Sequence, residues 1–413
     1  MKVLYIVTAY DRHPGDGITP WLVETIRRLR ARGVEVEVLA PSYKGLGSGS
    51  VEGVMVHRFR YAPARLETLT HDQHTPDRIR EHPLYAALLP GYLASSVLAA
   101  RRLVSTGRFD LVHVHWPLPH VIPGWAARRA AGIPLVLTFH GVEVTFARSS
   151  PIPLLVPFLR RAVRSADAVT ANSTYTAGLV RGLHDRPVDI LPFGSTVGAE
   201  EAPASVGSPT PSKDSPRSVS EASEAGNPAI LFVGRLVERK GVQHLLEAMA
   251  LLRDRPGHLH VVGHGPLRPQ LEGMAEDLGV SDRVTFHGFV PARELRRRFV
   301  SCDVFVLPAV RDAKGDVEGL GVVLVEALSF GRPVVASRSG GIVDIIRHEE
   351  TGLLVPPGEP AALAEAIGRL LEDPALAGRL GDAGRRHARE NFSWDAITGR
   401  LVGLYRRLAP EAA

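Results

Sequence analysis

Short runs of β-branched and other apolar residues alternate along this chain with longer stretches in which apolar residues recur every three or four positions. The short runs are typical of buried strands, and the longer stretches are typical of amphipathic helices. Strands that alternate with helices in this way form parallel sheets covered by helices on both faces. We therefore predict an α/β protein built from doubly wound sheets.

The pattern occurs in two halves of the chain. In the first half we expect a helix over residues 19–30, and in the second half a helix over residues 242–250. In the first of these helices the apolar residues Trp21, Leu22 and Ile26 fall on one face. The strands expected in the first half are residues 3–9, 34–39, 111–115, 135–139, 168–171 and 188–191. Those expected in the second half are residues 229–233, 259–262, 284–287, 304–307 and 333–336.

A segment of different composition separates the two halves. Residues 199–228 contain no aromatic residue and no Leu, Ile or Met, so they cannot bury enough apolar surface to offset the entropy lost on ordering. We predict that they form a disordered linker between an N-terminal domain, residues 1–198, and a C-terminal domain, residues 229–390. We expect residues 391–413 to form a C-terminal helix that packs back on the N-terminal domain.

The composition narrows the class of protein. With 413 residues, 45% of them hydrophobic and 23% charged, the chain has enough material for two cores. Its net charge of +5 suits phosphorylated ligands or an anionic membrane surface, and is too small and too dispersed to indicate nucleic-acid binding. The single cysteine, Cys302, excludes an internal disulfide and a cysteine-rich metal site, as expected for a reducing compartment.

Two apolar segments bear on location. The first residues, MKVLYIVTAYD, lack the length and the cleavage site of a signal peptide, so we expect a cytoplasmic protein. The longest apolar stretch, residues 84–100, is interrupted by Pro90, Gly91, Ser95 and Ser96 and falls short of the roughly 20 residues that a spanning helix needs. Residues 151–164 join an apolar start to a run of arginines. This pattern is compatible with contact at the inner, anionic face of a membrane, and equally with a helix packed on its own domain.

The first candidate site follows the strand at residues 229–233. Parallel sheets bind ligands beyond the carboxyl ends of their strands, so the loops there carry the candidates. Gly234, Arg235 and Lys240 lie between this strand and the next helix. The two cations stand beside a helix N-terminus, whose free amides favour anions. The arrangement predicts a diphosphate site, although strand-end cations are also common as solvated surface charges.

A second group of candidates follows the strand at residues 304–307. Glu318, Gly319, Leu320 and Gly321 precede a helix that carries Glu326 about two turns in. The glycines let backbone amides approach a ligand closely, and a carboxylate at Glu326 is able to accept both hydroxyls of a ribose. The alternative for Glu326 is an ordinary residue on a helix surface. In addition, Gly263 begins a flexible loop at the end of the strand at residues 259–262.

Three histidines lie at the ends of strands in the first half. His113 and His115 occupy alternate positions of one strand, which suggests metal ligands, but no third ligand or carboxylate is near in the sequence. We interpret them as ordinary strand residues and expect no metal site. His140 follows the strand at residues 135–139, and its position alone fits a hydrogen-bonded core histidine as well as a ligand-facing one.

Three ordered motifs in the second half form a recognisable set: Gly-Arg-Leu-x-x-x-Lys-Gly, two glutamates separated by seven residues, and Gly-Arg-Pro-Val-Val-Ala-Ser-x-x-Gly-Gly. Together with Thr-Phe-His-Gly at residues 138–141, they make the chain resemble the glycosyltransferases of family 4. The resemblance implies a GT-B fold, in which two doubly wound Rossmann-like domains face each other across a cleft. It also implies retaining, hexosyltransferase-type chemistry with a UDP- or GDP-sugar donor and no metal or other cofactor.

The family resemblance implies a role for each matched residue. Arg235 and Lys240 would hold the donor diphosphate and stabilise the charge on the departing phosphate. Glu326 would bind the ribose, Glu318 would hold the donor sugar, and His140 would face that sugar from the first domain. The implied catalytic residues are thus Arg235, Lys240, Glu318 and His140. The implied donor-binding residues are Gly234, Arg235, Lys240, Gly263, Glu318, Gly319, Leu320, Gly321 and Glu326.

The N-terminal loop is the implied acceptor and phosphate loop, formed by Gly15, Asp16 and Gly17. It departs from the family pattern, because relatives usually have adjacent glycines where this chain has Gly-Asp-Gly. The acceptor implied by the resemblance is a sugar or a lipid-linked sugar in bacterial glycolipid or polysaccharide synthesis.

Two other functions fit parts of the same pattern. A nucleotide-sugar epimerase or a sugar phosphorylase of the same fold would consume its substrate without an alcohol acceptor, or with free phosphate. A non-catalytic protein would bind sugar nucleotides as a sensor or bind nucleic acid through the basic surplus, and in the latter case binding would depend steeply on salt. The presence of both cations and both glutamates favours an active transferase.

Overall fold

The computed structural model describes residues 1–16, 18–71, 78–79, 82–195 and 227–410. The chain divides into two compact units, of which the first comprises Met1–Phe193 together with Trp394–Ala413, and the second comprises Gly194–Ser393. The expected linker, residues 199–228, lies outside the described residues except for its last two positions. The chain enters the first unit again at Trp394, three residues after the start of the expected C-terminal helix.

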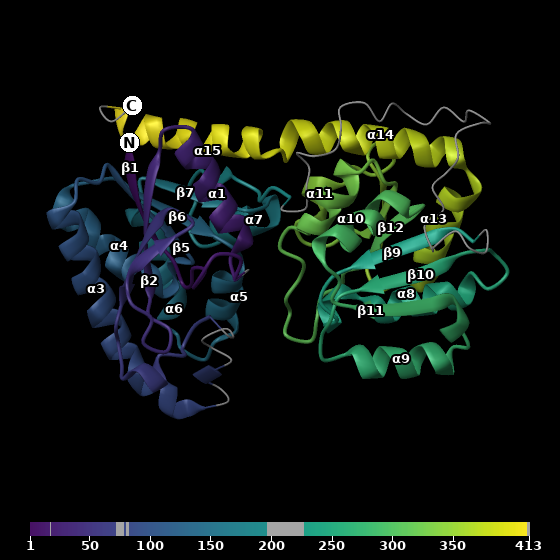
Figure 1. Cartoon of the computed structure of the whole chain (residues 1–413), viewed down its shortest axis with the longest axis horizontal. Helices are drawn as coiled ribbons and strands as arrows, with labels where there is room; N and C mark the ends of the chain where they lie inside the picture. Colours follow the sequence, from purple (N-terminus) through teal and green to yellow (C-terminus); the bar gives the residue numbers. More distant parts are fainter. Residues whose placement is uncertain (17, 72–77, 80–81, 196–226, 411–413) are drawn as a thin grey trace. The chain divides into compact units, whose positions relative to one another are not determined.

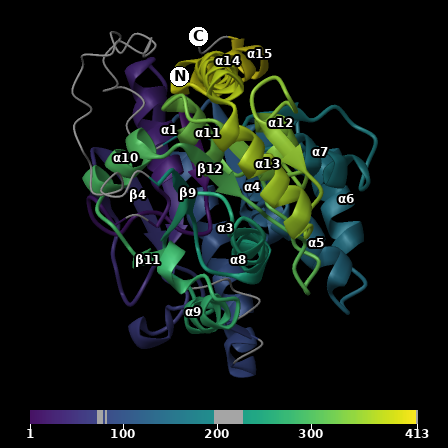
Figure 2. The same cartoon turned by 90° about the vertical axis from the view of Figure 1, so that its right-hand side faces the viewer.

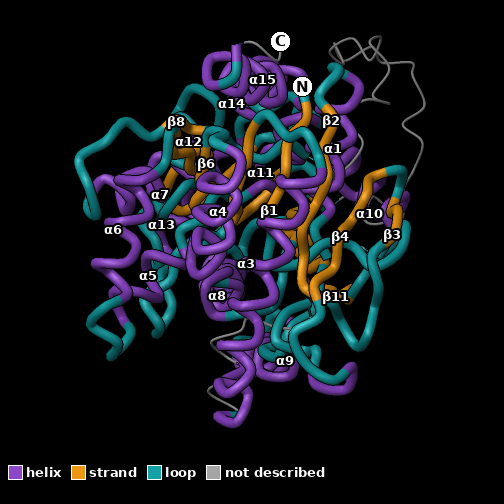
Figure 3. Tube along the Cα trace, turned by 90° about the vertical axis from the view of Figure 1, so that its left-hand side faces the viewer, coloured by secondary structure: helices purple, strands orange, loops and turns teal. Residues whose placement is uncertain are grey.

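The first unit is built on an eight-stranded sheet with the order β3-β4-β2-β1-β5-β6-β7-β8. Neighbouring strands are parallel throughout, apart from the antiparallel pair β3 and β4 at one edge. Figure 3 shows β1, β2 and β4 (orange) next to one another. The strands are β1 Lys2–Ile6, β2 Glu35–Pro41, β3 Gly49–Val51, β4 Val54–Phe59, β5 Leu111–His115, β6 Leu135–Phe139, β7 Ala168–Ala171 and β8 Asp189–Ile190.

Helices cover both faces of this sheet. They are α1 Pro20–Ala31, α3 Leu89–Thr106, α4 Pro117–Ala131, α5 Val142–Ser149, α6 Leu155–Ser165, α7 Thr174–Arg181 and α15 Trp394–Leu408, with short 3₁₀ turns η1 Ala64–Leu66 and η2 Pro83–Leu88. Side chains alternate along the central strand β1, so Leu4 and Ile6 pack in one core while Val3 and Tyr5 pack in the core on the opposite face. The helix α15 contributes Tyr405 to the second of these cores.

The helix α3 corrects an expectation from the sequence. The 3₁₀ turn η2 continues into α3, and residues Pro83–Thr106 are long and apolar enough, by length and composition, to cross a membrane. Pro90 does not interrupt the helix because it lies in its first turn, where the missing N–H has no role. The helix lies along α4 (Figure 1), with Tyr92, Ala100 and Val104 buried, and only 17% of its most apolar window is buried within the structure.

The second unit has a six-stranded parallel sheet with the order β11-β10-β9-β12-β13-β14. Its strands are β9 Ala229–Val233, β10 His258–Val262, β11 Val284–Gly288, β12 Val304–Leu307, β13 Val334–Ser337 and β14 Leu353–Val355. Its helices are α8 Val242–Leu251, α9 Arg268–Asp277, α10 Ala292–Ser301, α11 Val322–Ser329, α12 Ile342–Ile345, α13 Pro360–Glu372 and α14 Pro374–Asn391, with 3₁₀ turns η4 Glu238–Lys240 and η5 Ser281–Arg283. The helices α8 and α13 lie side by side (Figure 2), and α11 packs against α14.

The strand order of the second sheet reverses at β9 and β12, which are neighbours in the sheet but are separated in the chain by β10 and β11. Such a reversal leaves a crevice at the carboxyl ends of the two strands, where doubly wound folds bind their ligands. The loops that leave these ends carry Arg235, Lys240 and Glu318, so the predicted donor-site residues lie at the switch point of the sheet.

Candidate active site

The loop after β9 brings Lys240 to a buried carboxylate. The Nζ of Lys240 lies 2.6 Å from Oε2 of Glu318, and the guanidinium of Arg239 stands 3.9 Å from the same oxygen. The predicted partner cation, Arg235, is exposed at the start of the same loop. The structure therefore joins Lys240 and Glu318 directly and leaves the guanidinium of Arg235 open to solvent.

Glu318 is buried but remains charged. Burial on its own would raise the pKa of this carboxyl, but the nearby charges of Lys240 and Arg239 outweigh burial, so that the pKa is lowered. The backbone N–H of Gly321 also donates to the carboxylate. The ion pair consequently presents one fixed anion and one fixed cation at the start of α11, where free backbone amides add positive potential.

Glycines allow the loops of this site to pack tightly against one another. A Cβ at Gly340, which has a φ of +54°, would overlap the carbonyl oxygen of Glu318, and a Cβ at Gly263 would overlap the carbonyl oxygen of Gly234. The N–H of Gly341 donates to the Glu318 carbonyl at 2.9 Å. Gly263 and Gly234 were predicted as ligand-binding positions; in this structure the missing side chain of Gly263 lets its loop contact the backbone of Gly234.

Glu326 is buried in the middle of α11. Burial raises the pKa of its carboxyl to about 8, so this group is mostly protonated at pH 7 in the absence of a ligand. A protonated carboxyl both donates and accepts a hydrogen bond, which suits a pair of neighbouring hydroxyls. Leu320 is also buried, while Gly319 and Gly321 form the turn that leads into the helix.

In the first unit, His140 lies between two aromatic rings. Its ring is stacked on Trp116 with a centroid distance of 4.2 Å and an interplanar angle of 18°, and on Phe193 at 5.6 Å and 22°. Trp21, from the first turn of α1, packs against both His140 and Phe193. These rings come from three separate loops and helices, and they fix the plane of the imidazole.

The backbone at His140 is held by a further buried carboxyl, which the sequence reasoning missed. The N–H of His140 donates to Oε1 and Oε2 of Glu143 at 3.1 and 3.2 Å. Burial raises the pKa of Glu143 to about 7. Glu143 stands in the first turn of α5, four positions after the end of β6, and an acidic residue in a first turn is a recognisable helix-start signal.

The N-terminal loop is organised by a local ion pair. The guanidinium of Arg12 bonds to both carboxylate oxygens of Asp16, at 2.8 and 2.6 Å. The hydrogen bonds from Arg12 lower the pKa of Asp16 to about 2. Gly15 has a φ of +75° and makes the turn between them, whereas Gly17 lies outside the described residues. In its described part this loop thus uses Asp16 to bind Arg12.

Two profile comparisons match the chain. The profile described as "Glycosyl transferases group 1" matches residues 217–387, and the profile described as "Glycosyltransferase Family 4" matches residues 15–194. A GDP-mannose-dependent alpha-(1-6)-phosphatidylinositol monomannoside mannosyltransferase of Mycolicibacterium smegmatis is 35% identical over 343 residues, which cover 81% of this chain and 86% of that protein. The chain belongs to glycosyltransferase family 4.

A second member of family 4 matches along the whole chain. The D-inositol 3-phosphate glycosyltransferase of Salinispora tropica is 30% identical over 441 residues, which cover 100% of this chain and 86% of the relative. This chain is accordingly a nucleotide-sugar glycosyltransferase, as the sequence predicts.

Solved structures confirm the fold. Sucrose-phosphate synthase from Thermosynechococcus elongatus superposes with a TM-score of 0.73 at 24% identity and 100% coverage of both chains. HepE of Anabaena, solved with UDP and glucose, superposes with a TM-score of 0.69 at 21% identity, covering 99% of this chain and 100% of that one. The predicted family and the predicted GT-B fold of two α/β domains are both confirmed.

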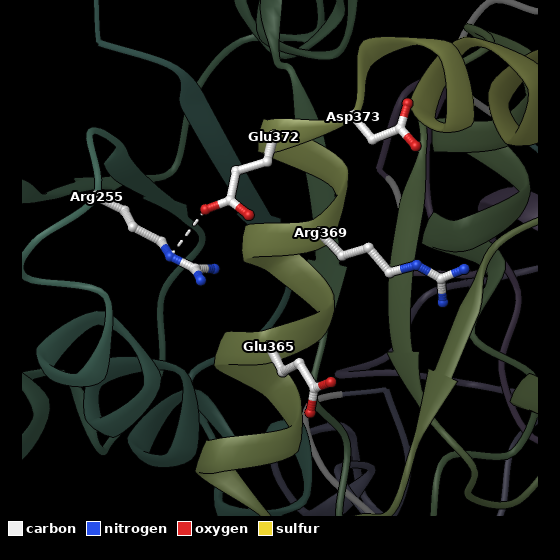
Figure 4. A pocket seen from close by; sticks show the side chains of 5 residues that line it. All are labelled: Arg255, Glu365, Arg369, Glu372 and Asp373. Atoms are coloured by element: carbon white, nitrogen blue, oxygen red, sulfur yellow. Dashed lines mark ion pairs between the residues drawn. The ribbon is translucent and has the colours of Figure 1, made fainter.

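A charged hollow lies elsewhere in the second unit. Its lining comprises Arg255, Glu365, Arg369, Glu372 and Asp373 (Figure 4), and Arg255 pairs with Glu372 at 3.0 Å. Arg255 precedes β10 and Asp373 follows α13, so the hollow belongs to the edge where the strands begin. Ligands of doubly wound sheets bind at the opposite edge, and we assign the hollow no part in transfer.

Proposed function

We propose that this protein is a retaining glycosyltransferase that moves a sugar from a UDP- or GDP-sugar to an acceptor hydroxyl. The observation that carries the proposal is the Lys240–Glu318 ion pair at the switch point of the second sheet. A cation and an anion held together beside free helix amides suit the two ends of one ligand, a diphosphate and a sugar hydroxyl. Lys240 would bind the diphosphate, and Glu318 would bind the sugar.

The remaining donor contacts follow from the same geometry. Arg235 is exposed and able to swing onto the diphosphate, and the amides of Gly319, Leu320 and Gly321 lead into α11. Glu326 would accept and donate hydrogen bonds to the two ribose hydroxyls. We propose that the fixed cations Arg235 and Lys240 stabilise the departing phosphate, so that transfer needs no metal ion.

The proposed reaction keeps the anomeric configuration. The acceptor oxygen would attack the anomeric carbon on the face that the phosphate leaves, and its proton would pass to the leaving phosphate oxygen. The bond that forms joins the acceptor oxygen to the anomeric carbon, and the bond that breaks joins this carbon to the phosphate oxygen. His140 would hydrogen-bond the donor sugar from the first unit, and the loop with Gly15, Asp16 and Gly17 would serve the acceptor.

The relatives favour an inositol-containing or glycolipid acceptor. Their names specify a phosphatidylinositol monomannoside and inositol 3-phosphate, and the first of these relatives is named as GDP-mannose-dependent. We propose a cyclitol or sugar hydroxyl on a phosphorylated or lipid-linked acceptor. Such an acceptor would place the enzyme in the cytoplasm, in peripheral contact with the inner face of the membrane.

Exposed residues of the first unit support this membrane contact. Ile152 and Leu154, just before α6, are 52% and 72% exposed. Arg160, Arg161 and Arg164 are exposed on the same helix, whose other face packs into the core. Apolar side chains beside cations at one surface are the usual pattern of a helix that binds anionic lipids.

The decisive experiment incubates the purified protein with UDP-glucose, UDP-galactose or GDP-mannose, with and without phosphatidylinositol or inositol phosphate, in the presence of EDTA. We expect product only with both substrates, and an anomeric configuration by NMR that matches the donor. Consumption of donor without an acceptor would indicate an epimerase, and a requirement for free phosphate would indicate a phosphorylase. Binding of DNA with a steep salt dependence, and no turnover, would indicate a nucleic-acid-binding protein.

A further inference from the structure

His115 and His140 share a hydrogen bond at the carboxyl edge of the first sheet. His115 is the last residue of β5, His140 follows the neighbouring strand β6, and Nδ1 of His115 lies 3.3 Å from Nε2 of His140. Burial lowers the pKa of His115 to about 3 and that of His140 well below its usual value. Both rings are therefore neutral at pH 7, and each carries one ring proton. One of the two facing nitrogens must donate, and the other must accept.

The surroundings of His115 decide which nitrogen donates. His115 is 4% exposed, and its other ring nitrogen, Nε2, is enclosed without a hydrogen-bond partner among the described residues. An enclosed N–H without an acceptor is rarer in folded proteins than an enclosed acceptor without a donor. The proton of His115 therefore belongs on Nδ1, from which it is donated to Nε2 of His140. With Nε2 accepting, the single proton of neutral His140 lies on Nδ1.

We propose that His115 is a positioning residue that holds His140 in the tautomer with its proton on Nδ1, so that His140 offers an N–H donor to the substrate. The inference rests on the proposed function, in which His140 contacts the donor sugar. Nδ1 of His140 has no partner within the described part of the chain and is not among the enclosed unpaired atoms, so it is open to a ligand.

The tautomer limits what His140 can do chemically. Its Nε2 lone pair already accepts the proton of His115, and its Nδ1 carries a proton. It therefore has no free lone pair with which to take a proton from the acceptor hydroxyl. His140 acts as a hydrogen-bond donor to a hydroxyl or phosphate oxygen and not as a general base.

The aromatic rings around His140 support this fixed role. Because the imidazole is stacked between Trp116 and Phe193, it cannot turn over to exchange its two nitrogens without separating the stack. Trp116 has a φ of +52°, an uncommon backbone conformation for a bulky residue, and its N–H donates to the carbonyl of Thr138. A strained residue of this kind at a strand end indicates that the position of its ring is needed.

The direct test is the protonation pattern of His140 measured by two-bond ¹H–¹⁵N NMR on ¹⁵N-histidine-labelled protein. The signals are assigned by their absence in His140→Asn. His120 is an internal reference, because its Nδ1 must donate to the Trp116 carbonyl while its Nε2 accepts from the Tyr92 hydroxyl. We expect His140 to show the same Nδ1–H pattern as His120. A proton on Nε2 of His140 would overturn the proposal, whether or not any donor supports turnover.

Two variants at His115 then test the consequence for transfer. His115→Phe keeps a flat aromatic ring at this position but removes the Nδ1–H donor. We therefore expect His140 to move to the Nε2–H form that free neutral histidine prefers. We expect kcat to fall by about tenfold or more, with little change in KM for the nucleotide sugar. In His115→Asn the side-chain amide replaces the Nδ1–H donor, and we expect both the tautomer and most of kcat to return. Equal losses in both variants, with the His140 pattern unchanged, would show a merely structural role.

Discussion

The ammonium of Lys240 lies 2.6 Å from the carboxylate of Glu318, although 78 positions separate the two residues in the chain. The pair joins the loop after β9 to the loop before α11, on the two sides of the switch point. A bound diphosphate would share the ammonium of Lys240 with the carboxylate of Glu318. The proposed function therefore predicts that transfer and the local contact between these two loops depend on the same ammonium group.

Replacing Lys240 tests this dependence. We expect Lys240→Ala to lower kcat by about 10²-fold or more, because a fixed cation at the leaving phosphate is lost. The far-UV circular dichroism should stay unchanged. Arg255→Ala is the matched control, since it also breaks an ion pair, with Glu372, at the edge of the sheet where the strands begin. Unchanged turnover in Lys240→Ala, or an equal loss in the control, would contradict the diphosphate role.

Glu326 should make the stability of the second unit depend on pH. Its pKa is raised to about 8 in the folded state, against an ordinary value near 4.5, so the folded state binds the proton more tightly than the unfolded state does. As the pH rises from about 4.5 to about 8, this group therefore reduces the free energy of unfolding, by about 1.4 kcal/mol for each pKa unit spanned. Above about pH 8 the loss is complete.

The variant Glu326→Gln should remove this fall in the free energy of unfolding with rising pH. Gln mimics the protonated carboxyl, so we expect equal stability near pH 4.5 and a more stable variant at pH 8, measured as the difference in unfolding midpoint at each pH. The buried histidines titrate equally in both proteins, so their effect on the unfolding midpoint cancels in the difference. A difference that stays constant from pH 4.5 to pH 8 would contradict the raised pKa.

The hydroxyl of Tyr405 joins the C-terminal helix to the first sheet. It lies 2.6 Å from the hydroxyl of Tyr5 and 2.6 Å from Nδ1 of His113, and all three groups are buried. We expect Tyr405→Phe to lower the free energy of unfolding by about 1–3 kcal/mol, because two buried polar groups lose a partner. Urea denaturation measures the change. Tyr85→Phe, which removes a part-buried bond to Thr68, should cost less; a larger cost there would count against the buried network.

The membrane proposal predicts a specific loss of lipid binding. We expect the double variant Ile152→Ser, Leu154→Ser to float less with vesicles that contain anionic lipid, while turnover on a soluble acceptor is unchanged. Leu251→Ser is the control, since Leu251 is an exposed apolar residue, 59% accessible, in the second unit. Flotation should weaken as the salt concentration rises. Equal flotation of all three proteins would argue against contact through residues 151–164.

The sequence predicted the central strands well because they are short, apolar and buried on both faces. β5, β6, β7, β9 and β12 have the bounds that the apolar runs indicated. The strands β3, β4 and β14 were missed. β3 has three residues with two of them exposed, β4 includes the adjacent polar residues His57 and Arg58, and β14 has only three residues. In α11, Val323 is only partly buried, and Glu326 occupies the interior beside Val325.

The meeting of Lys240 and Glu318 was predictable from the sequence, and the surroundings of His140 were not. Strand ends of a parallel sheet point to Lys240 and Glu318, because their loops must meet at one edge. The stacking of Trp116 and Phe193 on His140 depends on a left-handed residue and on a loop after β8, neither of which has a pattern in the sequence. His115 was interpreted as an ordinary strand residue, since its neighbour His140 lies 25 positions away, just after another strand.

The first unit takes its last helix from the far end of the chain. During synthesis the ribosome releases residues 1–193 long before α15, so the face of the sheet that Tyr405 and Leu401 cover is bare while the second unit is being made. The nascent first unit thus exposes apolar surface throughout translation of about two hundred residues. An expression tag or truncation that disturbs α15 would prolong this vulnerable period, and would reduce soluble yield before it altered any step of catalysis.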